Sequence, residues 1–331
     1  MNAVLVTGAA GFIGSHVCDA LIARGERVVG IDNFDTTLTP MAAKRRNLAE
    51  VLDGAPLGRF RLVEADVTHA DAMRAIFERE GPERVIHLAA RAGVTPSLKD
   101  PVGYTRVNVL GTSIVMDLAR RHGCRSFVMA SSSSVYGDRP GGAGSTPFRE
   151  DDACDSPISP YAATKRACEL LSSAEASASG GMGVACLRFF TVFGPRQRPD
   201  LAIARFMSRL REGEAIERRG DGSSSRDYTF VSDIVSGVLA ALAQAPEHGF
   251  RVWNLGHDEP VTLNELIRVL GEVTGIEARV REVSRAAGDV ERTHADLTRS
   301  RAELGYEPRT TLREGLERQW RWFSDVGSAP G

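Results

Sequence analysis

An apolar stretch at the start of the chain runs directly into a glycine-rich segment. Residues 2–7 read as a short buried strand, Gly8-Ala9-Ala10-Gly11-Phe12-Ile13-Gly14 follows, and an apolar-periodic helix comes next. Gly8 would allow a tight turn, Gly11 would let the backbone approach a pyrophosphate, and Gly14 would let the helix pack closely on the strand. Because a helix N-terminus also attracts anions, the segment predicts a phosphate-binding strand–turn–helix unit.

An acidic residue stands where the second strand should end. The apolar stretch from Arg27 to Ile31 is followed by Asp32, whose carboxylate could accept both ribose hydroxyls of an adenosine. The same carboxylate would repel a 2′-phosphate, so it favours NAD over NADP. Since strand, helix and acid all accompany the glycines, we expect a dinucleotide site rather than an ordinary strand-to-helix turn.

Strand-like and helix-like segments alternate through the first two thirds of the chain. This alternation predicts a Rossmann-type, doubly wound parallel sheet of the α/β class. The predicted strands are Ala3–Val6, Val28–Ile31, Phe60–Val63, Val85–Leu88, Phe127–Ala130 and Val184–Phe189.

Two of these strands end in segments that could contact a dinucleotide. Asp66, in Glu64-Ala65-Asp66-Val67, could hold an adenine amino group or could cap the helix that follows, and the sequence leaves both interpretations open. His87-Leu88-Ala89-Ala90 closes the fourth strand, where small residues would leave room for the nicotinamide ribose.

A tyrosine and a lysine stand four residues apart in Tyr161-Ala-Ala-Thr-Lys165, downstream of the serine-rich segment Ser131 to Ser134. On a helix the two side chains would share one face, so the ammonium could lower the pKa of the phenol. A free phenol titrates near pH ~10, so a base at neutral pH needs such a cation and a hydrogen bond. Ser159 as N-cap and Pro160 in the first turn would place Tyr161 at the helix start. We therefore expect Ser132, Tyr161 and Lys165 to be catalytic.

These motifs, together with Asn108 and Arg188-Phe189-Phe190, resemble the extended short-chain dehydrogenase/reductases over nearly the whole chain. Within that family the chain is most similar to nucleotide-sugar 4-epimerases, and among these to the UDP-glucuronate 4-epimerases. The resemblance implies a UDP-sugar substrate and a tightly bound NAD that is regenerated in each turnover. It implies cofactor contacts from Gly8, Gly11, Phe12, Ile13, Gly14, Asp32, Asn33, Asp66, Val67, Leu88, Ala89, Ala90, Asn108, Tyr161, Lys165 and Phe189.

The resemblance also places two residues at the nucleotide. It puts Arg226 at the diphosphate, which arginine can bind with paired hydrogen bonds, and Asp289 near the uridine ribose. From the residues alone, a salt bridge from Arg226 to Asp227 or another surface acid would be the favoured interpretation. Many relatives carry an arginine three residues before the aspartate, but here Ala286 stands at that place and Arg285 one step earlier. A second phosphate contact from that side is therefore in doubt.

The sugar is the more open question. Ser132, Ser133, Ser134, Thr191 and Arg198 could together surround a carboxylate, whereas UDP-glucose epimerases usually have asparagine at the position of Thr191. Alternatively, Ser133 and Ser134 satisfy backbone groups at a strand end and Arg198 binds the diphosphate. The acidic residues that related dehydratases and decarboxylases place before Val-Tyr-Gly are replaced here by serines.

Three functions follow from these observations. The first is a UDP-glucuronate 4-epimerase working through a transient 4-keto sugar, and the second is a UDP-glucose or UDP-N-acetylglucosamine 4-epimerase. The third, a non-catalytic NAD-binding sensor, is disfavoured because such proteins commonly lack the tyrosine or the lysine that this chain retains.

The expected organisation is a NAD-binding Rossmann domain over residues 1–190, with returning segments from about 230–256, and a nucleotide-sugar lobe over 191–325. Relatives often dimerise through helices that would run here over 101–122 and 160–178, so we expect a homodimer. The apolar positions Val107, Leu110, Ile114 and Leu118 fit either that interface or the core.

Composition and charge bear on possible partners, metals and cellular location. The 331 residues carry a formal net charge of −2, and arginines between Arg209 and Arg219 alternate with acids, so no nucleic-acid partner is expected. The five cysteines form no CxxC or metal-like cluster, so no metal is expected. A first strand from Asn2 and the lack of a long apolar run predict no signal peptide, no membrane span and a cytoplasmic location. The stretch from Asp138 to Ser156 reads as a surface loop whose order the sequence does not predict.

Overall fold

A computed structural model of the chain describes residues 3–138, 146–178, 181–284 and 288–327. Within these residues the strands form a seven-stranded, a three-stranded and a two-stranded sheet. The large sheet contains β1 (Ala3–Thr7), β2 (Arg27–Asp32), β3 (Phe60–Glu64), β4 (Arg84–His87), β5 (Ser126–Ser132), β6 (Gly183–Phe189) and β10 (Phe250–Leu255). The Rossmann-type sheet predicted from the alternation is thereby confirmed.

All neighbouring strands of the large sheet run parallel, in the order β10-β6-β5-β4-β1-β2-β3. The chain moves outward from β1 through β2 to β3 and then crosses back to β4 on the other side of β1. In open α/β sheets a ligand crevice forms at such a reversal, outside the carboxyl ends of the strands. The topology therefore directs a ligand to the ends of β1 and β4.

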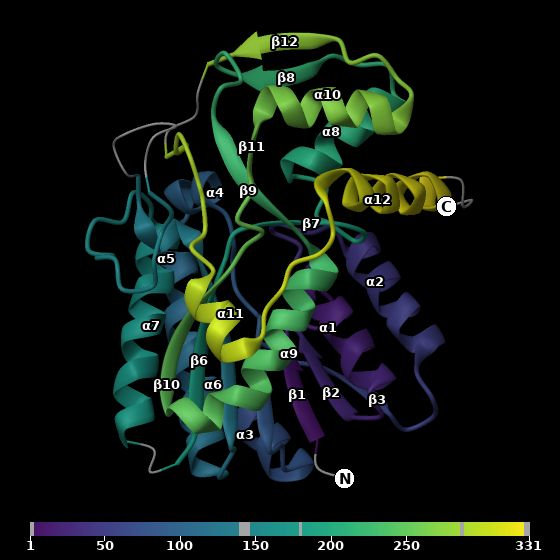
Figure 1. Ribbon diagram of the computed structural model, residues 1–331. Coiled ribbons are helices and arrows are strands. Elements are labelled where there is room, and N and C mark those ends of the chain that lie inside the picture. Colours follow the sequence, from purple (N-terminus) through teal and green to yellow (C-terminus); the bar gives the residue numbers. More distant parts are fainter. Residues whose placement is uncertain (1–2, 139–145, 179–180, 285–287, 328–331) are drawn as a thin grey trace.

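Helices cover both faces of the large sheet (Figure 1). The alternating side chains of β1 serve both faces, because Val4 and Val6 belong to one apolar cluster and Leu5 to another. On the first face lie α1 (Phe12–Ala23), α2 (Met41–Gly54) and α9 (Val231–His248), and on the second lie α3 (Ala70–Glu80), α6 (Gly111–Arg121) and α7 (Pro160–Ala178).

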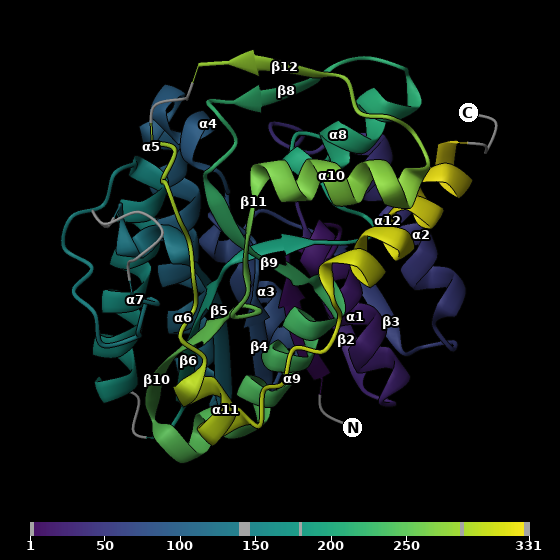
Figure 2. The ribbon, with the colours of Figure 1, turned by 45° about the horizontal axis from the view of Figure 1, so that its top comes forward.

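A second group of elements lies beyond the carboxyl ends of the large sheet (Figure 2). The three-stranded sheet consists of β7 (Thr191–Phe193), β9 (Ser225–Phe230) and β11 (Pro260–Thr262), and the two-stranded sheet of β8 (Ile216–Arg219) and β12 (Val280–Val283). The chain returns from β9 through α9 to β10 at the edge of the large sheet. The accompanying helices are α8 (Ala202–Arg211), α10 (Leu263–Thr274) and α12 (Leu312–Gly327), whereas α11 (Thr298–Leu304) packs against α9 and β10.

The helix predicted over 101–122 is present, but its middle is wound as a π-helix. It consists of α5 (Pro101–Tyr104), a π-helical segment (Thr105–Leu110) and α6, preceded by the short α4 (Val94–Lys99). The amide of Asn108, inside the π segment, bonds to the main chain of Arg91 and to the Thr164 hydroxyl. The sequence analysis did not anticipate this widened turn; such π segments are rare and occur frequently at functional sites.

A buried ion pair joins β6 to α7. Arg188 donates from Nε and Nη2 to the two carboxylate oxygens of Glu169, both at 2.9 Å, and its guanidinium lies 4.7 Å from the ring centre of Tyr136. Burial alone would raise the pKa of Glu169, but hydrogen bonds from Arg188, Ser131 and Arg166 lower it. The pair therefore stays ionised and fixes α7 against the strands that precede the site.

The start of α7 follows the predicted pattern. The Ser159 hydroxyl accepts a hydrogen bond from the Ala162 amide at 3.1 Å, which confirms the N-cap. Part of the preceding stretch, which was expected at the surface, is buried: Phe148 stacks on Tyr136 with ring centres 4.6 Å apart. Residues 139–145 of this stretch lie outside the described residues.

Candidate active site

A cavity of about 620 Å³ opens at the carboxyl ends of β1, β2, β4, β5 and β6, between the large sheet and the elements beyond it. Its walls bring together most of the residues selected from the sequence. These are Gly8, Gly11, Phe12, Ile13, Gly14, Asp32, Asn33, Val67, Leu88, Ala89, Ala90, Ser132, Tyr161, Lys165, Phe189, Thr191, Arg198, Arg226 and Asp289.

The glycine turn has the geometry that the sequence predicts. Gly8 has φ +74°, and a Cβ there would stand 2.9 Å from the Ala89 nitrogen. A Cβ on Gly14 would overlap the Gly8 carbonyl oxygen. Gly11 caps α1 at φ −75° and donates from its amide to that same oxygen at 3.0 Å. Side chains are excluded here, so the main chain at the start of α1 is open to an anionic ligand.

Asp32 is buried at the end of β2 and already has three donors. Its oxygens accept from the Ala10 and Phe34 amides at 3.0 and 2.9 Å and from the Lys44 ammonium at 2.8 Å. Lys44 comes from α2 and also lines the cavity. The sequence analysis missed Lys44, because nothing in the local pattern of α2 links it to Asp32.

Tyr161 and Lys165 lie on the first turns of α7 and Ser132 ends β5, and all three line the cavity. The Lys165 ammonium donates to the Ala130 carbonyl at 2.7 Å. Burial, aided by the positive charge of Lys165, lowers the pKa of His87 to about 3, so this histidine is neutral behind the site. Lys165, one helical turn after Tyr161, thus places a positive charge in the wall of the cavity.

A second tyrosine packs against the first. Tyr104 lies edge-on to Tyr161 with ring centres 6.2 Å apart, and its hydroxyl donates to the Ala92 carbonyl at 3.1 Å. Burial raises the pKa of Tyr104 to about 12, so it remains a neutral phenol. The sequence analysis did not identify this neighbour, which comes from α5.

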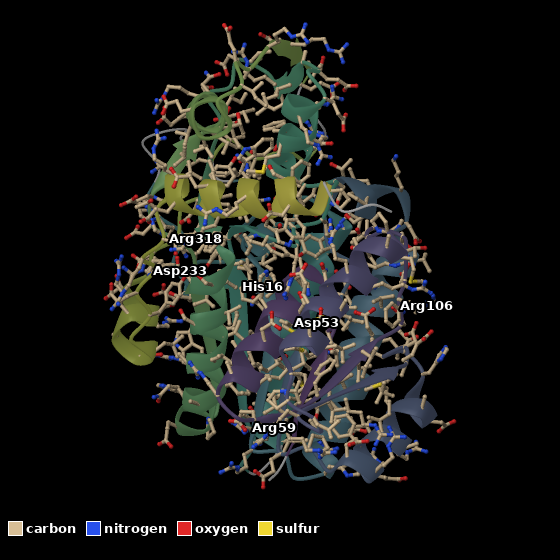
Figure 3. All side chains as sticks on the ribbon, turned by 90° about the vertical axis from the view of Figure 1, so that its right-hand side faces the viewer. His16, Asp53, Arg59, Arg106, Asp233 and Arg318 are labelled. Carbon is tan, nitrogen blue, oxygen red and sulfur yellow. The ribbon has the colours of Figure 1, made fainter. Side chains whose placement is uncertain are left out.

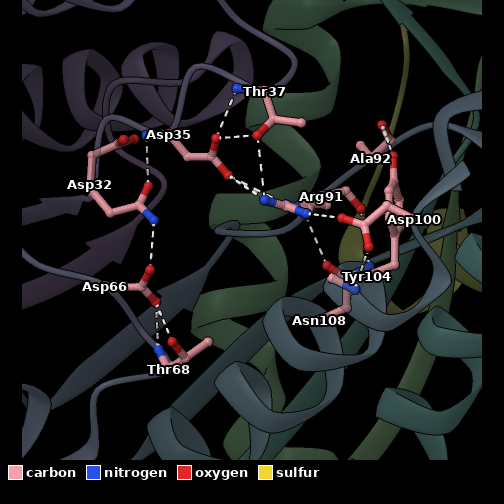
Figure 4. A network of polar contacts seen from close by, with 12 residues as sticks. Asp32, Asp35, Thr37, Asp66, Thr68, Arg91, Ala92, Asp100, Tyr104 and Asn108 are labelled. Carbon is pink, nitrogen blue, oxygen red and sulfur yellow. Dashed lines mark hydrogen bonds and ion pairs between the residues drawn. The ribbon is translucent and has the colours of Figure 1, made fainter.

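Four of the selected residues do not line the cavity. Ser133 and Ser134 lie in the short 3-10 helix Ser133–Tyr136, where the Ser134 amide and hydroxyl bond to the Ser132 hydroxyl at 3.2 and 3.1 Å. Asn108 is buried, and its amide bonds to the Arg91 main chain and the Thr164 hydroxyl. Asp66 accepts from Asn33 and Thr68, and the cap position of α3 is His69, so the N-cap interpretation of Asp66 is wrong (Figure 4).

Arginines gather at the end of the cavity that lies beyond the large sheet. Arg226 pairs with Asp289 at 2.5 Å rather than with Asp227, which is buried and bonded to the main chain of residues 257, 258 and 295. Arg219 adds a nitrogen 3.8 Å from the other oxygen of Asp289. The sequence analysis missed Arg219, because it considered the arginines between Arg209 and Arg219 only as charges that alternate with acids. Residues 285 and 286, considered for a second phosphate contact, lie outside the described residues.

Arg198 pairs with Asp200 through two hydrogen bonds, at 3.0 and 2.8 Å. The loop that carries Arg198 is fixed to the first face of the large sheet. Arg196, at φ +64°, donates to Asp19 of α1 and Glu50 of α2, and His16 of α1 bonds to the Pro195 carbonyl. Figure 3 shows His16 on the α1 side of the molecule, beneath α12. These contacts hold the loop of Arg198 against the helix that begins at the glycine turn.

Comparison with known proteins shows which family the chain belongs to. The model of the NAD dependent epimerase/dehydratase family matches residues 4–256. The chain belongs to this family. It is 37% identical to a UDP-glucuronate 4-epimerase of Thermodesulfobacterium geofontis, over 98% of this chain and 97% of that protein.

Two solved structures are also similar. One is a Bacillus cereus UDP-glucuronic acid 4-epimerase in complex with UDP-glucuronic acid and NAD, with a TM-score of 0.89 and 32% identity over 98% of this chain and 99% of that one. The other is a UDP-glucose 4-epimerase of Thermotoga maritima with UDP-glucose, with a TM-score of 0.89 and 31% identity over 98% and 100% of the two chains.

The cavity of this epimerase/dehydratase family member fits the family's cofactor, NAD. The glycine turn leaves room for a pyrophosphate, and Asp32 with Lys44 offers an acceptor and a donor for ribose hydroxyls. No group of three or more His, Cys, Asp or Glu in the described residues could hold a metal ion. None of the helices in the described part of the chain combines the length and apolar content of a membrane span.

Replacement of Gly11 by alanine tests the glycine turn. We expect the fold to persist, because φ −75° suits alanine and the new Cβ would meet only the Gly8 oxygen, at 3.0 Å. NAD affinity should fall at least about tenfold, which corresponds to ~1.4 kcal/mol, since the methyl group would stand where a pyrophosphate approaches. Calorimetric titration and the melting temperature would measure the two effects. Gly54→Ala, with open space around its Cβ, is the matched control, and equal affinities for all three proteins would contradict the prediction.

Proposed function

We propose that the protein is a UDP-glucuronate 4-epimerase, which interconverts UDP-glucuronic acid and UDP-galacturonic acid by inverting C4 of the sugar. One observation carries this proposal: a single cavity joins the glycine turn and Tyr161 to Thr191 and Arg198. The name of the T. geofontis relative and the ligands of the B. cereus structure support the same assignment.

In the proposed reaction, Tyr161 takes the proton from the sugar O4. Lys165 supplies the positive charge that favours the phenolate, and Ser132 positions the proton in transit. NAD, when bound, accepts the hydride of C4 and returns it to the opposite face of the sugar. The 4-keto sugar must turn about its diphosphate linkage between the two steps while Arg226 holds the phosphates. The cofactor is regenerated in each turnover.

A glucuronate makes an additional demand on the site. Its 4-keto form is a β-keto acid, which loses CO₂ when negative charge moves from the carboxylate into the ring. Donors such as Thr191 and Arg198 stabilise the localised charge more than the decarboxylation transition state and so protect the intermediate. These two side chains are therefore proposed as the carboxylate site.

A neutral UDP-hexose, either UDP-glucose or UDP-N-acetylglucosamine, remains the second candidate substrate, and two observations favour it. Ser133 and Ser134 do not line the cavity, and Arg198 is already paired with Asp200. In this alternative Arg198 is a phosphate ligand. The NAD sensor is not pursued, because Ser132, Tyr161 and Lys165 all line the cavity.

For the domain organisation we propose that residues 1–190 bind the cofactor, with the returning segments near 230–256, and that 191–325 mainly bind the nucleotide sugar. The cavity supports this division, since Asp32 and the glycine turn lie in the first part and Arg226 and Asp289 in the second. We also propose a cytoplasmic location, because all five cysteines are free thiols, and cell fractionation would check it.

The proton NMR spectrum of the purified protein with UDP-glucuronic acid and no added NAD tests the proposal. A galacturonate anomeric signal should appear, and a parallel sample with UDP-glucose should stay unchanged. Tyr161→Phe should slow the reaction by about 10²–10⁴-fold, because the general base is lost. Conversion of UDP-glucose alone would refute the carboxylate assignment while leaving the Tyr161 chemistry intact.

Arg198→Ala separates the two candidate substrates. If Arg198 binds the sugar carboxylate, kcat/KM for UDP-glucuronic acid should fall about 30-fold or more, whereas the Kd for UDP should change little. Arg226→Ala is the comparison, because loss of a phosphate contact should weaken both by similar factors. Equal losses for Arg198→Ala would assign it to the diphosphate.

We propose that the protein forms a homodimer through α5 to α7. Of the apolar residues considered there, Leu118 is buried in the chain's own core, but Leu110 is 47% exposed. Val102 of α5 and Leu170 of α7, two helices that contact the π segment of Leu110, are 77% and 56% exposed. Exposed leucines on neighbouring helices are typical of an interface. Light scattering should give twice the monomer mass, and Leu110→Glu with Leu170→Glu should give the monomer. A wild-type monomer would contradict the proposal.

A further inference from the structure

The side chain of Arg91 links two loops that lie apart in the sequence (Figure 4). Its Nε and Nη2 donate to Asp35 Oδ2 at 3.3 and 3.2 Å, and Nη2 also reaches the Thr37 hydroxyl at 3.4 Å. Its Nη1 donates to Asp100 Oδ2 at 2.6 Å. One guanidinium thus holds the loop after β2 and the start of α5 together.

This ion pair crosses the carboxyl end of β1, where the glycine turn would hold the dinucleotide. Asp35 follows β2 and Arg91 follows β4, and these strands flank β1 on either side. The ion pair therefore reaches across the carboxyl end of β1, where the glycine turn begins α1. Both residues also line the cavity. A dinucleotide that extends from Asp32 toward Lys165 has to pass this crossing point.

Arg91 is held firmly from behind. The Asn108 amide accepts from the Arg91 backbone nitrogen at 2.8 Å and donates to its carbonyl at 3.0 Å. Asn108 also donates to the hydroxyl of Thr164, which donates to the Tyr161 carbonyl. A Cβ on Gly103 would overlap the Arg91 guanidinium, so α5 leaves space for it. The arginine end of the link is thus fixed to the catalytic helix.

The other end belongs to a loop that lacks regular structure, residues 33–40. Asp35 organises this loop by accepting from the Thr37 amide and hydroxyl at 2.8 and 2.5 Å. Desolvation would raise the pKa of Asp35, but hydrogen bonds from Thr37 and Arg91 lower it, so the carboxylate stays charged. The loop is thereby tied to the Arg91 side by one partly exposed ion pair.

We propose that Arg91 and Asp35 form a latch that retains NAD: the ion pair closes the loop 33–40 over the dinucleotide cleft, and the cofactor leaves only when the pair opens. Arg91 is a positioning residue in this role and takes no part in the chemistry. The inference rests on the family's cofactor and not on the identity of the sugar. It suits a reaction that returns its hydride, because such an enzyme gains nothing from releasing NAD between turnovers.

The rate of NAD release from the purified holoprotein tests the latch, measured by displacement with an excess of a fluorescent NAD analogue. Arg91→Gln and Asp35→Asn should each release NAD about tenfold faster, the size expected for a partly buried charge-assisted pair. The double variant should be no faster than either single one, because both break the same contact. Asp35→Asn keeps the acceptor for Thr37, so it should leave the loop's own turn intact.

Two further measurements make the result specific. Asp71→Asn removes a carboxylate from an exposed ion pair on α3, outside the cavity, and should leave the release rate unchanged. Added salt should accelerate release from the wild type and have less effect on the two latch variants.

Two outcomes would overturn the proposal. If release from Asp35→Asn is unchanged, the pair does not retain the cofactor. If release becomes slower, Arg91 freed from the carboxylate binds the NAD phosphates directly and is a ligand instead. Because the readout is cofactor release, failure of the UDP-glucuronate assignment would leave this result unaffected. If Arg91→Gln does not fold, Asp35→Asn and its control still decide the question.

Discussion

The close approach of the glycine turn to the end of β4 is the constraint on which the rest of the site depends. Gly8 lies against the main chain of Ala89, and Gly14 lies against Gly8 itself, so no side chain fits between the strands and α1. This leaves the start of α1 and the end of β4 exposed to one cavity. The dinucleotide turn and the residues after β4 are thereby brought together before any ligand binds.

Several charged side chains in the cavity wall form ion pairs with one another. Asp32 pairs with Lys44, Arg198 with Asp200, and Arg226 with Asp289, each within 3.0 Å. Burying an isolated charge is costly, so pairing allows these groups to be held in place without a ligand. An anionic ligand then competes with a carboxylate for each arginine. This competition favours ligands whose several negative charges engage more than one arginine at once, as a nucleoside diphosphate does.

The two ends of the cavity are mechanically linked through α1. Its N-terminus forms the glycine turn, and His16 and Asp19 farther along it hold the loop of Arg198. Glu50 of α2 holds the same loop and also accepts from Trp322 of α12. The glycine turn and the loop of Arg198 are therefore both fixed to the helix pair α1 and α2.

Local patterns determined much of this protein. Glycine spacing, the acid at Asp32 and the four-residue interval from Tyr161 to Lys165 act within one turn or strand, so the sequence alone could assign these residues to a cofactor and catalytic site. The alternation of strand-like and helix-like segments likewise predicted the parallel sheet. Tertiary structure decided the partners. Lys44, Arg91 and Arg219 meet carboxylates that are 12, 56 and 70 residues away. Ser133 and Ser134 lie in one short 3-10 helix and do not line the cavity. Such pairings follow from the order of strands and the path of loops, which leave no periodic signal in the sequence.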